Sequence, residues 1–105
     1  MPRGCTHLDH VVVTDLPDAV DGCPECLEIG SPWCHLRMCL ECGHVGCCDD
    51  SPNRHATRHA RASGHPIIRS IQPDEEWSWC YADELLMVIP EVRGRPAIPP
   101  SPLCG

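Results

Sequence analysis

Three short stretches decide the fold of this chain: C-P-E-C at residues 23–26, C-L-E-C-G-H-V-G-C at residues 39–47 and H-A-T-R-H-A-R-A-S-G-H at residues 55–65. Structural zinc is held by four thiolate or imidazole ligands, and cysteine pairs are commonly spaced C-x2-C. The stretches supply eight such donors: Cys23, Cys26, Cys39, Cys42, Cys47, His55, His59 and His65. Eight donors are enough for two closed sites.

The pairing of these donors is left open by their spacing. His55 and His59 are four residues apart on an expected helix, so both rings project from one face. They could bind one zinc, as in H-E-x-x-H enzymes, but Ala56 replaces the glutamate base of that motif. The two rings could equally serve different zinc ions.

The composition favours metal over disulfides. One hundred and five residues make one domain, and the absence of phenylalanine leaves a thin apolar core that metals can supplement. Ten cysteines could mean a secreted disulfide scaffold, but no apolar signal segment precedes residue 11 and seven histidines accompany the thiols. We therefore expect a cytoplasmic protein with no membrane span.

The charge argues against a nucleic-acid partner. The formal net charge is −7, with eight arginines and no lysine, whereas affinity for nucleic acid comes largely from neutralised phosphates. Arginine without lysine, with abundant alanine, glycine and proline, is also typical of a GC-rich bacterial genome.

The chain predicts an α+β domain over residues 1–89, in which a small, mostly antiparallel sheet and one main helix are held by zinc. Strand patterns cover residues 33–38, 67–71, 77–81 and 85–89. A helix is expected over residues 53–62, with Ser51 as its N-cap and Pro52 at its first position. Residues 90–105 are rich in proline and predict a disordered or extended tail.

The order and spacing of these donors resemble the UBP-type zinc finger: C-x2-C, Trp33, C-x2-C-x4-C and then H-x3-H-x5-H-P. The resemblance covers roughly residues 5–84 and implies a small, stand-alone version of that module. It implies cross-braced pairing, with one zinc on Cys23, Cys26, Cys47 and His55. The second zinc would bind Cys39, Cys42, His59 and His65.

Some members of that family carry a third zinc, held by an N-terminal C-x-H and a later C-x2-C. Cys5 and His7 match the first pair and Cys80 begins the second, but Asp83 stands at the fourth position. A carboxylate oxygen is an acceptable zinc ligand. We therefore expect a third zinc on Cys5, His7, Cys80 and Asp83, the alternative being a frayed terminus.

Three cysteines remain outside these sets. Cys34 and Cys48 are expected to be small buried side chains, and Cys104 a free thiol in the tail. Cys47 is preferred to Cys48 as the ligand because it keeps the family's five-residue step from Cys42.

The family recognises the free C-terminal diglycine of ubiquitin, and the resemblance makes Trp33, Trp79 and Tyr81 the candidates for lining a peptide groove. Trp77, Trp79 and Tyr81 alternate along one expected strand, which places them on one face. The family's arginine, two residues after the ligand cysteine, is replaced here by Asp49, a poor partner for a terminal carboxylate. Arg37 or Arg54 could take its place from a neighbouring strand or helix.

These observations predict a zinc-binding module for a protein or peptide C-terminus, with ubiquitin itself disfavoured by Asp49. Four-ligand zinc sites leave no open position for water, so we expect no enzyme activity. The alternatives are a purely structural interaction domain, a zinc-dependent enzyme and a nucleic-acid binder.

Overall fold

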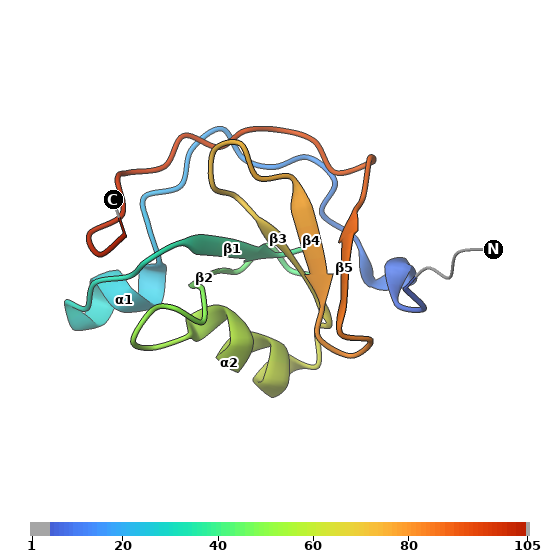
Figure 1. Cartoon of the computed structure of the whole chain (residues 1–105), viewed down its shortest axis with the longest axis horizontal. Helices are drawn as coiled ribbons and strands as arrows, with labels where there is room; N and C mark the ends of the chain where they lie inside the picture. The colour runs from blue at the N-terminus through green and yellow to red at the C-terminus, as the bar shows by residue number, and fades with distance from the viewer. Residues whose placement is uncertain (1–4, 105) are drawn as a thin grey trace.

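The computed structural model describes residues 5–104 and has a five-stranded sheet as its centre (Figure 1). Along the chain lie the 3-10 turn η1 (Leu8–His10), helix α1 (Pro24–Ile29), strands β1 (Leu36–Cys39) and β2 (Val45–Cys47), helix α2 (His55–Ser63), and strands β3 (Ile67–Ser70), β4 (Trp77–Cys80) and β5 (Leu85–Val88). The strand order is β2-β1-β3-β4-β5 and every neighbouring pair is antiparallel. This is the predicted α+β architecture.

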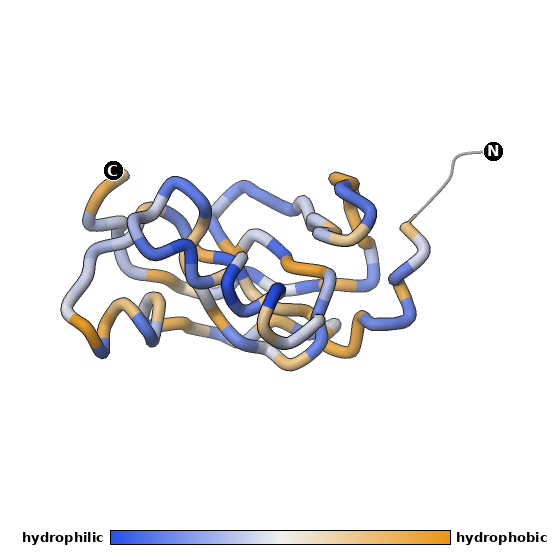
Figure 2. The backbone as a smooth tube through the Cα atoms, turned by 90° about the horizontal axis from the view of Figure 1, so that it is seen from below, coloured by the Kyte–Doolittle hydropathy of each residue, from blue (hydrophilic) through white to orange (hydrophobic). Residues whose placement is uncertain are grey.

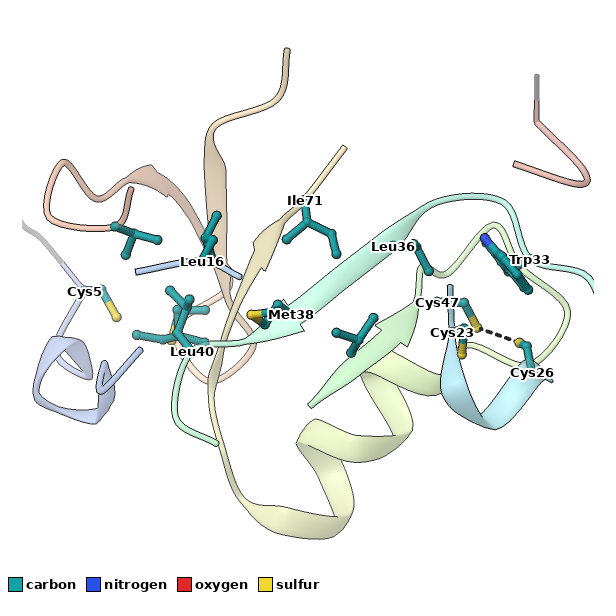
Figure 3. Close-up of a cluster of buried hydrophobic side chains, with 14 residues drawn as sticks. Cys5, Leu16, Cys23, Cys26, Trp33, Leu36, Met38, Leu40, Cys47 and Ile71 are labelled. Carbon is teal, nitrogen blue, oxygen red and sulfur yellow. Dashed lines mark hydrogen bonds between the residues drawn. The ribbon is translucent and has the colours of Figure 1, made fainter. Parts of the chain in front are cut away.

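One face of the sheet carries the hydrophobic core. Leu36, Met38, Val45 and Ile67 lie on this face and belong to one buried cluster. The segment after η1 and the chain after β5 run side by side across this face, opposite α2 (Figure 1). Figure 3 shows Leu16 from the first segment beside Leu40 and Ile71. Both ends of the chain therefore close the core.

The other face of the sheet is only partly covered. Helix α2 packs on β2 and β1, and the fit is close because a Cβ on Gly46 would lie 2.5 Å from the backbone nitrogen of Ala56. The register places Ile68 opposite Trp79, and Trp79 opposite Leu86, on this same face. The half of this sheet face that α2 does not cover therefore carries the aromatic side chains.

The predicted start of the main helix is wrong. Helix α2 begins at His55, after Arg54 in a left-handed conformation with φ 48°. The backbone N–H of His55 donates to Cys47 Sγ at 3.2 Å, so a cysteine sulfur accepts from the first turn where a side-chain cap was expected. Ser51 instead accepts a hydrogen bond from the Cys34 backbone N–H at 2.7 Å.

Two elements were absent from the prediction. Helix α1 starts at Pro24, which needs no N–H partner at that position, and stops at Gly30 with φ 70°. Strand β2 has only three residues. Both lie inside the cysteine-rich stretch, where cysteines and glycines give no hydrophobic period to follow.

The proline-rich tail follows an extended path along the N-terminal segment. Isolated parallel bridges join Asp15 to Arg93 and Ala19 to Ala97, and Val92 is buried in the core cluster. Residues of the tail therefore contact the domain in the described structure, where a disordered or extended tail was predicted. The division of the chain at residue 90 stays a prediction.

The expectation of a free thiol at Cys104 is wrong, because the structure joins Cys104 to Cys34 in a disulfide. The two cysteines are 70 residues apart in sequence, and such a pairing has no local sequence signal. The covalent link fixes the end of the tail beside the start of β1.

Hydrophobic stretches of the backbone are short and interrupted by polar ones (Figure 2). Over residues 5–104, no helix has the length and apolar character needed to cross a membrane.

Candidate metal centres and binding groove

The first cluster joins Cys23, Cys26, Cys47 and His55, all buried. His55 Nδ1 lies 3.2, 3.3 and 3.5 Å from the sulfurs of Cys23, Cys26 and Cys47, and the sulfurs of Cys26 and Cys47 are 3.7 Å apart. A tetrahedron with zinc–ligand bonds of about 2.0–2.3 Å has edges of roughly 3.5–3.8 Å. Two of the four separations reach this range and the other two are slightly shorter, so the donors already lie close to the arrangement that zinc requires.

Three different elements build this first cluster. Cys23 and Cys26 flank and enter α1, Cys47 ends β2, and His55 begins α2. Figure 3 shows the three sulfurs together beside Trp33. Asn53 Nδ2 lies 3.9 Å from Cys26 Sγ and also donates to Ser31 Oγ at 2.7 Å. These polar contacts hold the donors in place, as partners behind metal ligands commonly do.

The second cluster joins Cys39, Cys42, His59 and His65 and lies nearer the surface. Cys39 Sγ is 3.5 Å from His65 Nδ1, and Cys42 Sγ is 3.2 Å from His59 Nε2. Gly43 follows Cys42 with φ 82°, which is the left-handed turn expected of a cysteine knuckle. Cys39 ends β1 and Cys42 lies in the turn that follows it. This part of the chain therefore places both sulfurs beside the histidines of and after α2.

Protonation in these clusters is set by burial. Burial lowers the pKa of His59, with further contributions from His44 and His65, and this favours the neutral ring that a metal needs. Burial raises the pKa of the Cys26 thiol to about 12. Such a thiol is protonated at neutral pH until a cation displaces the proton.

The third cluster joins Cys5, His7, Cys80 and Asp83. His7 Nδ1 lies 3.0 Å from Asp83 Oδ2 and 3.7 Å from Cys80 Sγ. Hydrogen bonds from the Cys5 thiol and from the Thr6 backbone N–H hold the pKa of Asp83 well below its usual range. The start of the chain is therefore tied to the turn between β4 and β5, with an ionised oxygen donor facing two sulfurs.

These groupings match the cross-braced pairing and the third set implied by the family resemblance. His55 and His59 belong to different clusters, although both lie on α2. The chemistry of the donors fits zinc in all three clusters, and the number of bound ions stays a prediction.

A groove lies beside α2 on the uncovered half of the sheet. Its first hollow, of about 270 Å³, has nine lining residues: Arg37, Cys48, Asp49, Asp50, Ile68, Trp77, Trp79, Tyr81 and Leu86. A second hollow, of about 460 Å³, continues toward the end of α2. The two hollows share Asp49, Trp79 and Tyr81, so these side chains lie at the middle of one elongated surface.

The predicted aromatic face is present in this groove. Trp77, Trp79 and Tyr81 all line the first hollow and are half-buried. Trp33, the third groove candidate, is placed elsewhere: it is 7% exposed, belongs to the core cluster and packs on Gly22. The sequence pattern placed Trp33 at the start of a strand over residues 33–38, whereas β1 begins at Leu36 and Trp33 lies before it.

Arg37, one of the two arginines that could take the place of the family's arginine, reaches the hollow from β1. Its guanidinium lies 4.6 Å from the centre of the Trp77 ring and its Nη1 lies 3.7 Å from Glu75 Oε1. Its position opposite Ser70 in the antiparallel register places it on the groove face. The alternating pattern of β1 could have located it.

Asp49 holds the side chain of Tyr81 in place through Thr57. Thr57 Oγ1 donates to Asp49 Oδ1 at 2.5 Å and lies 3.0 Å from the Tyr81 hydroxyl. Burial raises the pKa of Tyr81, which keeps the hydroxyl protonated. Asp49 therefore has a partner within the fold, where the family resemblance implies an arginine that contacts ligand.

The fold and the clusters define a small zinc-binding α+β domain with an exposed groove. Residues 23–90 match the family described as "Zn-finger in ubiquitin-hydrolases and other protein", and the chain belongs to this family. It is therefore a zinc-binding module.

Individual relatives extend this comparison. The chain is 42% identical over 48 residues to ubiquitin carboxyl-terminal hydrolase 16 of Mus musculus and to its counterpart in Rattus norvegicus, over 42% of this chain. It covers only 6% and 5% of those hydrolases. The solution NMR structure of protein RPA1320 from Rhodopseudomonas palustris is 50% identical, with a TM-score of 0.76 over 97% of both chains.

Proposed function

We propose that this chain is a zinc-stabilised module that binds the C-terminal segment of a partner protein in the groove around Trp79 and Tyr81. The observation that carries the proposal is the row of aromatic side chains (Trp77, Trp79 and Tyr81) on an uncovered sheet face. These side chains lie next to α2, the helix that the first two metal clusters anchor. Flat rings can pack against a peptide backbone that has small side chains. The apolar surface continues along β5, where Leu86 and Val88 are 60% and 63% exposed.

The charges of the first hollow set the chemistry of the ligand. Among the residues that line it, Arg37 is the cation and Asp49 and Asp50 are the anions. A terminal carboxylate would pair with Arg37 and avoid the two aspartates. Because Asp49 stands at the family's arginine position, we propose a C-terminus other than that of ubiquitin as the preferred ligand.

Two of the metal clusters support the groove, because each positions one of its sides. The first cluster holds the start of α2, and the third fixes the turn that follows Tyr81. The sites act structurally in this proposal, and no step of catalysis is assigned to them. A cytoplasmic location and the absence of a nucleic-acid partner stay predictions from composition.

A fluorescence titration of the tryptophans tests the proposal. The probes are peptides that end in Gly-Gly, as the free acid and as the amide. We expect the acid to bind at least about tenfold more tightly, since a hydrogen bond to a charged group contributes about 1.5–3 kcal/mol. Arg37→Gln should remove this difference, and Trp79→Ala should abolish binding of both peptides.

The matched control is Arg58→Gln, because Arg58 is exposed on α2 and lines neither hollow. It should bind like the unchanged protein. Equal binding of acid and amide would refute the role of Arg37. No response to either peptide would favour an interaction domain whose zinc ions only build the fold, and hydrolysis of a peptide would favour an enzyme.

A further inference from the structure

A fourth group of soft donors converges outside the three clusters. Cys34, His35 and Cys48 place one ligand atom each within 4.8 Å of one another. The two cysteines are 3% and 6% exposed. Two buried cysteine sulfurs and an imidazole at this separation form, once Cys34 is reduced, the donor set of a zinc site with three protein ligands.

The strand pairing fixes this group. His35 precedes β1 and Cys48 follows β2, and the Cys48 backbone N–H donates to the His35 carbonyl at 2.9 Å. This hydrogen bond extends the antiparallel ladder in which Leu36 faces Cys47. The geometry therefore belongs to the framework of the sheet, one residue beyond the first metal cluster.

A buried hydroxyl supports the sulfur of Cys48. Ser51 is 3% exposed and its Oγ accepts the Cys34 backbone N–H at 2.7 Å. The same oxygen lies 3.6 Å from Cys48 Sγ, so its proton is available to the sulfur. A hydroxyl that donates to a thiolate stabilises the charged form that a metal requires.

The tail brings a fourth donor, the sulfur of Cys104, to the same place. Ser101 Oγ donates to the Trp33 carbonyl at 3.1 Å and accepts the Cys104 backbone N–H at 2.8 Å. This turn sets Cys104 beside Cys34, with their Cα atoms 4.9 Å apart. Cys104 is the only member of the group that lies in the segment after β5.

We propose that Cys34, His35 and Cys48 form a further zinc site in the reduced protein, with Cys104 as its exchangeable fourth ligand. The Cys34–Cys104 disulfide is the alternative state of the same residues, because a sulfur in a disulfide is not a thiolate donor. The site clamps the tail in both states, by a covalent bond in one and by a metal ion in the other.

The conversion between the states is balanced by a dithiol reductant. The dithiol gives two electrons and two protons to the Cys34–Cys104 bond and becomes a disulfide itself. The products are two thiols on the protein. Zinc then binds, and the thiols of Cys34, Cys48 and Cys104 release their three protons to solvent.

Zinc counting by native mass spectrometry tests the proposal without any substitution. The protein is loaded with excess zinc and desalted, with the disulfide intact in one sample and reduced in the other. The intact mass reports the redox state through the two added hydrogens. We expect one more zinc ion per chain in the reduced sample, and equal counts would overturn the proposal.

Variants then assign the ligands in reducing buffer. Cys34→Ser with Cys48→Ser should bind one zinc ion fewer than the unchanged protein. The control Cys104→Ser removes the disulfide and keeps three donors, so it should retain the additional zinc even without reductant, with weaker affinity. Loss of the additional zinc in Cys104→Ser but not in the double variant would contradict the assigned site.

Discussion

Asp83 is an oxygen donor in a cluster whose other members are two thiols and an imidazole. It accepts from the Thr6 backbone N–H and hydroxyl as well as lying beside His7. We expect Asp83→Ala to bind one zinc ion fewer than the unchanged protein under the same conditions, because the third cluster loses a ligand. Native mass spectrometry gives the count.

The adjacent substitution Glu84→Ala is the control, since Glu84 is exposed and outside the cluster. It should leave the zinc count unchanged. An unchanged count in Asp83→Ala would show that Asp83 holds the N-terminal segment only by hydrogen bonds.

Thiol protonation makes zinc binding depend on pH. Burial raises the pKa of Cys5 and of Cys26 to about 12, so both carry a proton at neutral pH before metal binds. Zinc displaces these protons, and binding therefore weakens as the pH falls. We expect the affinity to drop about tenfold per pH unit for each proton released.

Competition with a coloured chelator between about pH 6 and pH 8 measures this dependence, and an indicator dye counts the released protons. A pH-independent affinity would mean that the donors are already ionised in the metal-free protein.

Single residues also show what sequence spacing can and cannot predict. Spacing identified the ligand pairs of the C-x2-C and C-x-H kind, whereas the division of the twelve expected ligands into three groups came from the family resemblance. Cys34 and Cys104 have no such partner nearby, and Trp33 lies before β1 although a strand was predicted from residue 33. Their positions depend on how distant segments pack, which spacing along the chain does not encode.

At the level of elements, Gly46 controls how closely α2 approaches the sheet. An added Cβ would collide with the backbone of Ala56 and His55, at 2.5–2.9 Å. We expect Gly46→Ala to lower the free energy of unfolding by about 1–3 kcal/mol, as overpacking does. Denaturant unfolding of the zinc-loaded protein measures the loss.

Gly30→Ala provides the comparison, because Gly30 has φ 70° but no neighbour within 4 Å of an added Cβ. Its cost should be confined to backbone strain of about 1 kcal/mol. A stability loss in Gly46→Ala no larger than this would mean that α2 can shift away from β2 freely.

The elements themselves were only partly predictable. Strands β3, β4 and β5 follow apolar and aromatic patterns, and the sequence located them. The start of α2 was misplaced because Ser51 and Pro52 resemble a helix start. In the structure the backbone N–H of His55, the first residue of the helix, donates to the sulfur of Cys47. Helix α1 and strand β2 are too short for a hydrophobic period.

Over the described molecule, the metal clusters and the hydrophobic core share residues. Five of the fourteen members of the core cluster are cysteines of the metal clusters. Removal of zinc leaves these thiols without ligand bonds, so we expect a chelator to unfold the domain. Far-UV circular dichroism and resistance to a protease measure the change, and survival of both would contradict a structural role for zinc.

The separations between paired donors suggest an order of assembly for the nascent chain. Cys39 and His65 are 26 residues apart, whereas Thr6 and Asp83 are 77 apart. Closing the longer loop costs about 1 kcal/mol more in chain entropy. We expect the two inner clusters to fold first and the terminal one last. During synthesis, the inner clusters would then bind metal before the C-terminal tail leaves the ribosome.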